Sequence, residues 1–429
     1  MGGGFTGLWT AYQISGLRPD LRVVVLEQDI CGGGPSGRNG GFASGWWDEL
    51  DGLVALYGED AAVRICRAIS DAITGIGDFC ATEGVDAWFN RAGYVFAATT
   101  EAQMEVREHM VKAARDVGAA EEMVALDPTE VGARCDSPRF RAGALMRDAA
   151  SVQPALLARG LRAACLRRGV VIHEDTTVNG IRDGRMCEIL TSSGVIRAPH
   201  VVMAVNAWAS AWPRLRRRLV AWSSYMVLTE PAPDLLREIN WTGGELVSDL
   251  RTSIRYFRTT RDGRIAFGGG GGRARSRIDD SFTSDSRAVA EVAEGFRRLF
   301  PSFAQVPIVD AWGGPIDVST THLPWFGTLP SGNVHAALGY TGNGVAPSHL
   351  AGRVLADLVL ARDTDLTRLA LVNAPLRQFP VEPFRSLGAA VVRRAIIAKD
   401  TAEERGERAN PLASAIAHLP RRMGYLLGP

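Results

Sequence analysis

The sequence has little lysine, no closely spaced cysteines and no surplus of charge of either sign. Its 48 basic and 47 acidic residues leave a net charge of +1. This balance argues against nucleic acid as a main partner, because binding to phosphates needs a clustered basic surplus. The six cysteines include no CxxC pair, so neither a zinc site nor a dithiol redox motif is indicated. Reduced thiols in a cytoplasmic protein are the simplest interpretation.

Long apolar runs are missing as well. The longest stretches, such as residues 201–212, are shorter than the ~20 residues that cross a bilayer, so we expect no membrane span. The chain of 429 residues is 46% hydrophobic and 22% charged, which is typical of a globular enzyme with two or more domains.

The apolar pattern alternates between helical and strand-like periods. Helical spacing over residues 6–15 is followed by a β-branched segment, 21–26, which predicts a buried parallel strand. Further helices are predicted over residues 53–82, 101–117, 154–169, 284–300, 346–360, 389–397 and 412–427. Strands are predicted at residues 93–98, 170–173, in a meander of 176–181, 186–191 and 195–198, at 200–205 and within 222–268, and residues 310–344 are predicted to be turn-rich.

One glycine-rich turn indicates a cofactor. Residues 2–7 read GGGFTG and satisfy G-x-G-x-x-G at the start of the first helix. Gly2 would allow a tight turn, Gly4 would let the backbone approach a pyrophosphate, and Gly7 would let helix and strand pack closely. Phosphate oxygens would sit at the helix N-terminus, and Glu27, after the next strand, would accept hydrogen bonds from an adenosine ribose. The alternative is a purely structural turn.

Two later glycine-rich segments favour FAD over NAD. Residues 31–41 read CGGGPSGRNGG, and residues 339–344 read GYTGNG immediately before a predicted helix. The positive end of that helix would face a flavin carbonyl and stabilise the reduced anion. Three glycine-rich segments whose backbones could contact a cofactor suit the long FAD molecule better than NAD. An NAD-dependent dehydrogenase is therefore the less favoured alternative.

Taken together, these segments resemble the D-amino-acid-oxidase-like family of FAD-dependent oxidoreductases, in the branch of sarcosine-oxidase-like and gamma-glutamylputrescine-oxidoreductase-like proteins. The resemblance rests on GGGFTG, VVVLEQ, CGGGPSGRNGGF, SVQPALLARGL, VVMAVNAW, YFRTTRDGRIAFGGG and GYTGNGVAPSHLAGRVLADL. It implies an α/β fold with a Rossmann-like FAD-binding domain and a second, antiparallel-sheet α+β substrate domain. The implied boundaries are 1–85, 145–220 and 306–365 for the first domain, 86–144 and 221–305 for the second, and 366–429 for a C-terminal helical tail.

The resemblance also implies which residues hold FAD. The ADP half would be bound by Gly2, Gly4, Gly7 and Glu27. The remaining implied contacts are Ser36, Arg38 and Asn39 beside the pyrophosphate or isoalloxazine, Val178 at the adenine, Asn206 at a strand end, and Gly342, Asn343 and Gly344 at the flavin pyrimidine. An ordinary residue of the meander is an equal alternative for Val178.

In this family a hydride passes from the carbon next to an amine nitrogen to flavin N5, and the imine is hydrolysed in water. A small-molecule amine is therefore the expected substrate. Tyr256 and Arg258 alternate along one predicted strand and so share a face, from which either would orient a polar or anionic substrate end. A solvent-facing strand edge is the alternative. His322 would lie on the substrate side of the flavin, with a simple turn residue as the alternative.

Three departures from the family pattern refine these expectations. Relatives with covalent flavin carry a cysteine where residues 312–315 read WGGP, so FAD should be non-covalent. The lysine that promotes reaction with oxygen in sarcosine oxidases matches Ala266, which leaves oxygen or another electron acceptor open. The arginine that holds the substrate carboxylate in sarcosine oxidases would align near Gly41. A simple N-methyl amino acid is therefore a poor candidate for the substrate.

Dinucleotide folds need a strand immediately before the glycine-rich turn, and only Met1 precedes it in this sequence. We therefore expect that the first Rossmann strand is missing, that the central sheet has a gap and that FAD is held weakly. A cofactor-poor remnant that acts as a binding protein is the alternative to an enzyme.

Overall fold

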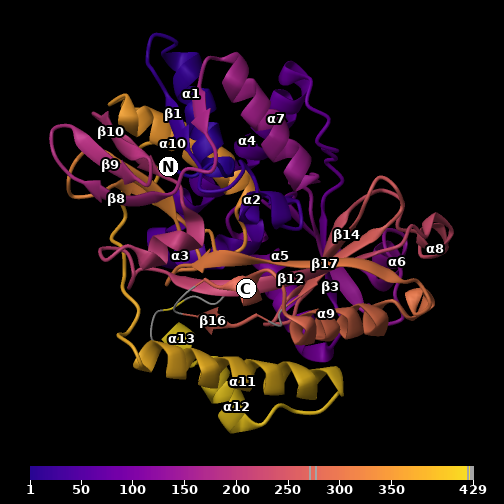
Figure 1. The fold of residues 1–429 in the computed structure, drawn as a ribbon. Helices are drawn as coiled ribbons and strands as arrows, with labels where there is room; N and C mark the ends of the chain where they lie inside the picture. The colour runs from indigo at the N-terminus through magenta and orange to yellow at the C-terminus, as the bar shows by residue number, and fades with distance from the viewer. Residues whose placement is uncertain (270–271, 276–277, 423–424, 426–429) are drawn as a thin grey trace.

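The computed structural model describes residues 1–269, 272–275, 278–422 and 425. A helical region with short strands lies above a large sheet in Figure 1, and the C-terminal helices lie below that sheet. The predicted helical segment 412–427 reaches beyond the described residues at 423–424 and 426–427.

The helical region is built around one buried helix. Its members are α1 (Phe5–Leu17), α3 (Leu50–Tyr57), α4 (Glu59–Glu83), α7 (Pro154–Arg167) and α10 (Val345–Val359). The helix predicted over residues 53–82 is interrupted at Gly58, whose φ of +79° is a left-handed conformation that favours glycine. Pro154 occupies the first turn of α7, where a missing N–H does no harm.

Trp9 anchors α1 between two neighbouring helices. Its ring centroid lies 4.8 Å from that of Phe79 in α4 and 4.7 Å from that of His349 in α10, both edge-on. Gly352 permits this packing, because a Cβ there would meet Trp9 Cβ at 2.4 Å. The N-terminus of α1 is thereby held in a fixed place.

Short parallel strands flank the start of α1. β1 (Val24–Leu26) pairs with β7 (Val171–His173), and β11 (Val201–Met203) pairs with β19 (Val334–Leu338), which is antiparallel to β18 (Trp325–Thr328). Gly2 N donates to Leu26 O at 2.8 Å, and Ala204 N donates to Met1 O at 2.9 Å, so Met1 and Gly2 bond to both groups of strands. That the first Rossmann strand is missing stays a prediction.

The predicted meander is present as β8 (Val178–Arg182), β9 (Cys187–Thr191) and β10 (Gly194–Ala198), all antiparallel. A small antiparallel pair, β2 (Phe42–Ser44) with β6 (Ala149–Ser151), follows the short helix α2 (Pro35–Arg38).

Within the described residues, the large sheet has nine strands in the order β16-β12-β15-β14-β13-β3-β5-β4, with β17 also paired to β12. Their bounds are β3 (Tyr94–Ala98), β4 (Met123–Leu126), β5 (Ala142–Met146), β12 (Val220–Thr229), β13 (Leu246–Asp249), β14 (Arg255–Thr259), β15 (Ile265–Gly269), β16 (Ala274–Arg275) and β17 (Ile308–Val318). Most pairs are antiparallel, but β13 and β3 are parallel, so the sheet is mixed.

β17 is the main element that the sequence pattern missed. Gly313, Gly314 and Pro315 indicate a turn, yet all three lie in a strand that pairs with β12 along its whole length. Proline is tolerated in such a position on an edge strand, because the missing N–H would point away from the ladder.

Strands of the large sheet are contacted by α5 (Glu101–Asp116), α6 (Pro128–Gly132) and α9 (Ser286–Leu299), and α8 (Pro233–Glu238) follows β12 in the chain. Asp285 caps α9 by accepting from Arg287 N and Ala288 N, in agreement with the start predicted near residue 284. Phe257 and Phe267 stack at 5.1 Å between centroids beneath α9, and burial of each such ring contributes about 2 kcal/mol.

The C-terminal segment forms α11 (Phe384–Glu404), α12 (Pro411–Ala417) and α13 (Leu419–Arg422). Among the described residues, no helix combines the length and the apolar character needed to cross a bilayer. Likewise, the described residues contain no group of three or more His, Cys, Asp or Glu side chains placed to hold a metal ion.

Candidate functional site

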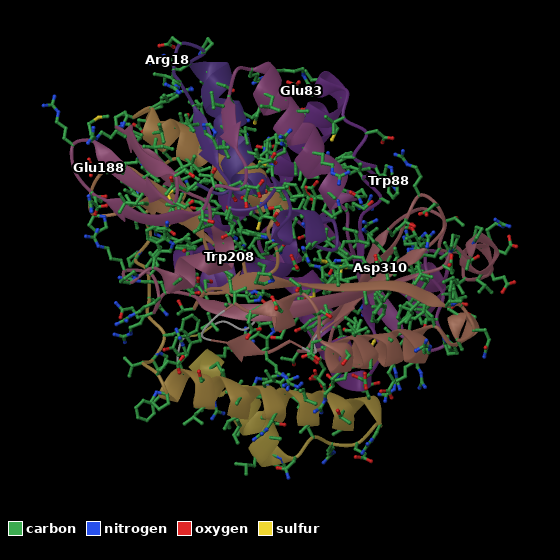
Figure 2. The ribbon with its side chains drawn as sticks, viewed as in Figure 1. Arg18, Glu83, Trp88, Glu188, Trp208 and Asp310 are labelled. Atoms are coloured by element: carbon green, nitrogen blue, oxygen red, sulfur yellow. The ribbon has the colours of Figure 1, made fainter. Side chains whose placement is uncertain are left out.

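A cavity of about 1200 Å³ is lined by the helical region, the large sheet and the C-terminal segment. Ordinary small-molecule sites range from about 300 to 1,000 Å³, so this one has room for more than a single small ligand. Trp208, which lines it, is seen between the two layers in Figure 2. The lining comes from distant parts of the chain, and the predicted site residues Gly2, Gly4, Glu27, Ser36, Arg38, Asn39, Val178, Asn206, Tyr256, His322, Gly342, Asn343 and Gly344 all take part.

The predicted dinucleotide turn forms one end of the cavity. Gly2 has a φ of +92°, and a Cβ on Gly2 would meet Ala204 O at 2.2 Å. Gly7 does not line the cavity: a Cβ there would meet Gly2 O at 2.0 Å, so its hydrogen lets the helix close on the turn. A side chain at Gly2 or Gly7 would therefore collide with a backbone oxygen, and the cofactor-binding roles of these glycines stay predictions.

The start of α1 suits an anion. No acidic residue lies in its first turn, and a Cβ on Gly4 would meet Ser36 Oγ at 2.8 Å, so a larger residue would fill this cradle. Phe5 N donates to Ser36 Oγ at 2.8 Å, which fixes the predicted glycine-rich loop against the helix end. The amides and dipole at a helix N-terminus attract phosphate, so the residues present fit the pyrophosphate of FAD.

Glu27 occupies the place expected of a ribose-binding acid. Its Oε2 accepts from Gly3 N at 2.7 Å and its Oε1 accepts from Asp29 N at 3.0 Å. A carboxylate has further lone pairs for a ligand hydroxyl. Val178, at the start of β8, lines the same end of the cavity.

The loop around α2 is held by its own side chains. Arg38 Nε donates to Gly33 O at 2.7 Å, and Asn39 Oδ1 accepts from Gly41 N at 2.7 Å. Ser36, Arg38 and Asn39 therefore form one preorganised wall of the cavity.

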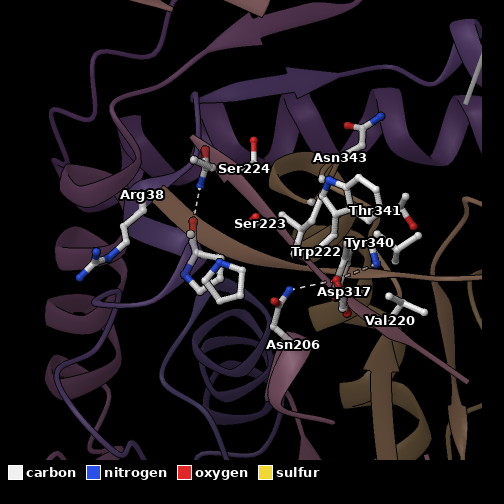
Figure 3. Close-up of a pocket in the computed structure, with 18 of the residues that line it drawn as sticks. Arg38, Asn206, Val220, Trp222, Ser223, Ser224, Asp317, Tyr340, Thr341 and Asn343 are labelled. Carbon is white, nitrogen blue, oxygen red and sulfur yellow. Dashed lines mark hydrogen bonds between the residues drawn. The ribbon is translucent and has the colours of Figure 1, made fainter. Parts of the chain in front are cut away.

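Asp317 joins two of the predicted cofactor loops, although the sequence pattern did not single it out. Asp317 Oδ1 accepts from Asn206 Nδ2 at 3.0 Å and from Tyr340 N at 3.1 Å, as the dashed lines in Figure 3 show. Its Oδ2 accepts from Gly339 N at 2.6 Å. Burial raises the pKa of Asp317 to about 7, against the lowering effect of these three donors.

The loop that Asp317 supports leads into α10. Asn206 and Thr341 line the cavity and have φ values of +45° and +51°, in the left-handed region that is costly for residues with a side chain. Such conformations cluster at functional sites, where the surrounding structure holds them. Asn343 Oδ1 accepts from Ser44 Oγ at 2.7 Å, and no acid lies in the first turn of α10. The positive end of α10 therefore opens on the cavity, as its predicted role requires.

The structure separates the two predicted residues of β14. Tyr256 lines the cavity, and its hydroxyl lies 2.9 Å from Ser224 Oγ. Arg258 is not among the lining residues: its Nε donates to Gly40 O at 2.5 Å and its Nη1 donates to Thr259 O at 3.1 Å. Burial lowers the pKa of Arg258 to about 10, which leaves it charged at neutral pH. A contact between Arg258 and substrate requires it to leave these bonds and stays a prediction.

His322 lies in an acidic corner of the cavity. His322 has a φ of +63°, and its Nδ1 lies 3.1 Å from Glu49 Oε1. Burial opposes the charged imidazole, but the carboxylates of Glu49 and Asp48 outweigh it and raise the pKa of His322. Burial, followed by the charge of Glu49, raises the pKa of Asp48 to about 7. Asp48 Oδ1 has no hydrogen-bond partner within the described part of the chain.

Sequence reasoning missed Asp48, Glu49 and Asp317. The available signal for the first two was an acid pair that directly follows two tryptophans and the glycine-rich loop. No local signal marks Asp317, because its strand has the composition of a turn.

No cysteine and no lysine is found among the described residues that line the cavity. Lys112 pairs with Asp116 at the surface, and Lys399 lies 2.9 Å from Glu403 in α11. Non-covalent binding of FAD stays a prediction.

Comparison with known proteins gives related enzymes over most of the chain. Gamma-glutamylputrescine oxidoreductase of Escherichia coli is 28% identical over 399 residues, which cover 91% of this chain and 90% of that protein. Glycine oxidase of Pseudomonas aeruginosa is 27% identical over 382 residues, or 85% of this chain and 94% of that protein. The crystal structure of glycine oxidase from Geobacillus kaustophilus matches with a TM-score of 0.73 at 22% identity, covering 86% of this chain and 96% of that one.

The match to glycine oxidase confirms the expected mixed α/β fold with a large sheet. The family described as FAD dependent oxidoreductase (DAO) matches residues 1–358, which confirms the expected enzyme class and FAD as the cofactor. The chain belongs to the DAO family of FAD-dependent oxidoreductases.

Proposed function

We propose that this protein oxidises an amine at the carbon next to nitrogen, with FAD bound non-covalently. The observation that carries the proposal is a single cavity in which the dinucleotide turn and a buried acidic corner meet. Relatives named for gamma-glutamylputrescine and for glycine, both of which contain a C–N bond to oxidise, support the substrate class.

In this proposal Gly2, Gly4, Glu27 and Val178 would hold the ADP half of FAD. The flavin half would be held by Ser36, Arg38, Asn39, Asn206, Gly342, Asn343 and Gly344. When bound, FAD would supply the hydride acceptor for the carbon next to the amine nitrogen, and water would hydrolyse the resulting imine to a carbonyl compound. The chain's own residues bind and orient the amine and exclude solvent.

The acidic corner provides the recognition of a cationic amine. His322 Nδ1 lies 3.1 Å from Glu49 Oε1, and Asp48 adds a negative charge to this corner when it is ionised. With its pKa near 7, Asp48 is able to hold an ammonium group and to take its proton, which leaves the neutral amine that loses a hydride. Tyr256, supported by Ser224, orients a polar part of the substrate. Arg258 is the candidate for an anionic group.

The electron acceptor is oxygen or another acceptor. Ala266 in place of the lysine typical of sarcosine oxidases favours an acceptor other than oxygen. The division into an FAD-binding domain (1–85, 145–220 and 306–365), a substrate domain (86–144 and 221–305) and a tail (366–429) stays part of this proposal, as does a cytoplasmic location. We do not carry forward the binding-protein alternative, because no observation supports it.

Product analysis tests the proposal. The FAD-loaded protein is incubated with a panel of primary amines, secondary amines and amino acids, with oxygen or with an artificial dye as acceptor, and carbonyl products are trapped with a hydrazine reagent. We expect carbonyl product from at least one amine, in an amount equal to the acceptor reduced. Absence of carbonyl product across the panel, in protein that retains FAD, would contradict the proposal.

A further inference from the structure

The cavity extends past the residues assigned to FAD and ends against the C-terminal helix α11. Ala389, Val392, Ile396 and Ile397 of α11 line it, and their spacing places them on one face of the helix. The match to the family model ends at residue 358, so this wall lies outside the residues that the model matches. Figure 1 shows α11 running beneath the large sheet.

The far end of α11 is fixed by buried polar contacts. Asp400, which is 1% exposed, accepts from Ser253 N at 2.9 Å and also from Ser253 Oγ. Glu404 Oε1 lies 2.9 Å from Arg251 Nη1 and 2.7 Å from Arg255 Nη2. Ser253 and Arg251 themselves line the cavity, so the helix is attached to the rim of the site. Breaking a buried ion pair leaves an uncompensated charge, so this attachment resists opening.

The near end is attached to the segment that precedes β12. Phe379 N donates to Arg217 O at 2.7 Å, and Arg385 Nη1 donates to Arg216 O at 2.8 Å. Between the two attachments, Arg393 Nε donates to Gly272 O at 2.8 Å. The middle of α11 is therefore held across the cavity at a fixed distance from the sheet.

The surface that α11 presents to the cavity is apolar. Ala389, Val392 and Ile396 are half-buried, and the facing wall includes the half-buried side chains of Ile254 and Trp222. Such an apolar surface stabilises a complex only when an apolar group of the ligand displaces the water that covers it.

We infer that α11 is a specificity wall: the amine substrate carries an alkyl or aryl extension of several carbon atoms that packs against Ala389, Val392 and Ile396. This inference rests on the proposed function, because it names the substrate class of the same cavity. It makes the C-terminal segment part of the substrate site and gives that segment a task beyond covering the fold.

Adjacent residues of α11 offer matched test variants. Ala389→Trp fills the cavity from the helix, whereas Ala390→Trp adds the same side chain on the exposed face. A second pair serves if the first does not fold. Val392→Trp is its test variant, and Val391→Trp is its control, because Val391 is 49% exposed. The probes are primary n-alkylamines of increasing chain length. Two quantities are measured on the FAD-loaded full chain: kcat/KM for each amine, and the dissociation constant from the anaerobic change in the flavin spectrum.

In the wild type, affinity should rise about fourfold for each added methylene, which corresponds to the ~0.8 kcal/mol gained when one is buried. Ala389→Trp and Val392→Trp should abolish this rise and weaken the longest amines at least tenfold, with the shortest amine unchanged. Ala390→Trp and Val391→Trp should behave as wild type.

Oxidation of short and long amines with equal efficiency by wild type and Ala389→Trp would overturn the inference and leave the proposed function standing. A change confined to the KM of the electron acceptor would also overturn it. If no amine reduces the flavin, the proposed function fails, and the inference about the amine substrate fails with it.

Discussion

Replacing Gly7 with alanine should destabilise the protein and weaken FAD binding, whereas the same replacement at Gly16 should not. Both glycines lie in α1 (Phe5–Leu17), where exchange of glycine for alanine gains up to about 1 kcal/mol of helix propensity. At Gly7 the new Cβ would lie 2.0 Å from Gly2 O, a backbone atom of the dinucleotide turn. At Gly16 it would lie 2.6 Å from Arg168 Nη1, the end of a flexible side chain.

Overpacking of a rigid contact costs up to about 3 kcal/mol. After the gain of about 1 kcal/mol in helix propensity is subtracted, the free energy of unfolding of Gly7→Ala should be about 2 kcal/mol lower than that of the wild type. Gly16→Ala should be neutral or more stable by up to about 1 kcal/mol. Because the strain displaces the turn that holds the pyrophosphate, the FAD dissociation constant of Gly7→Ala should rise about 10- to 100-fold, or about 1.4–2.8 kcal/mol. Urea unfolding of the apoprotein and fluorescence titration with FAD measure the two effects. Equal stability and equal FAD affinity in the two variants would refute the steric argument.

Three further predictions concern charge and the cofactor. The pKa of Asp317 is raised to about 7 by burial, whereas in the unfolded chain it returns to the ordinary value near 4, so the free energy of unfolding should fall as pH rises between these two values. Asp317→Asn should flatten this slope in urea unfolding series, and an unchanged slope would show that Asp317 titrates normally. For a cationic amine, kcat/KM should increase as pH rises through about 7, where Asp48 ionises. Asp48→Asn should lose this increase, and an increase that persists in the variant would show that another group causes it. Acid precipitation should release all flavin as free FAD, because no cysteine is among the described lining residues, and flavin that stays with the protein would contradict non-covalent binding.

Local features of the sequence predicted the glycine-rich turn at the start of α1. This turn depends on steric limits that act within a few residues, since a Cβ at Gly2 or Gly7 would meet a backbone oxygen at 2.2 or 2.0 Å. Helices such as α1 and α5 were also predictable, because their apolar residues recur at helical spacing within one segment. The break at Gly58, by contrast, was missed because apolar spacing continues on both sides of it.

Features that depend on distant partners were not accessible in this way. β17 has the composition of a turn, and only pairing with β12 makes it a strand. Asp317 acquires its role by bonding to loops 111 and 22–23 residues away in the chain. The alternation of Tyr256 and Arg258 predicted a shared face, but the bond from Arg258 to Gly40, 218 residues away, determines where the side chain goes. The placement of α11 against the cavity likewise depends on long-range contacts with Ser253 and Arg251.

Anaerobic reduction of the bound flavin tests the central claim most directly. The protein is loaded with FAD, oxygen is removed, and amines are added one at a time while the visible flavin absorption is followed. Amine oxidation in this cavity predicts that a suitable amine bleaches the flavin band, with one carbonyl product formed for each flavin reduced. A fully loaded protein whose flavin stays oxidised with every amine and amino acid tested would contradict the account.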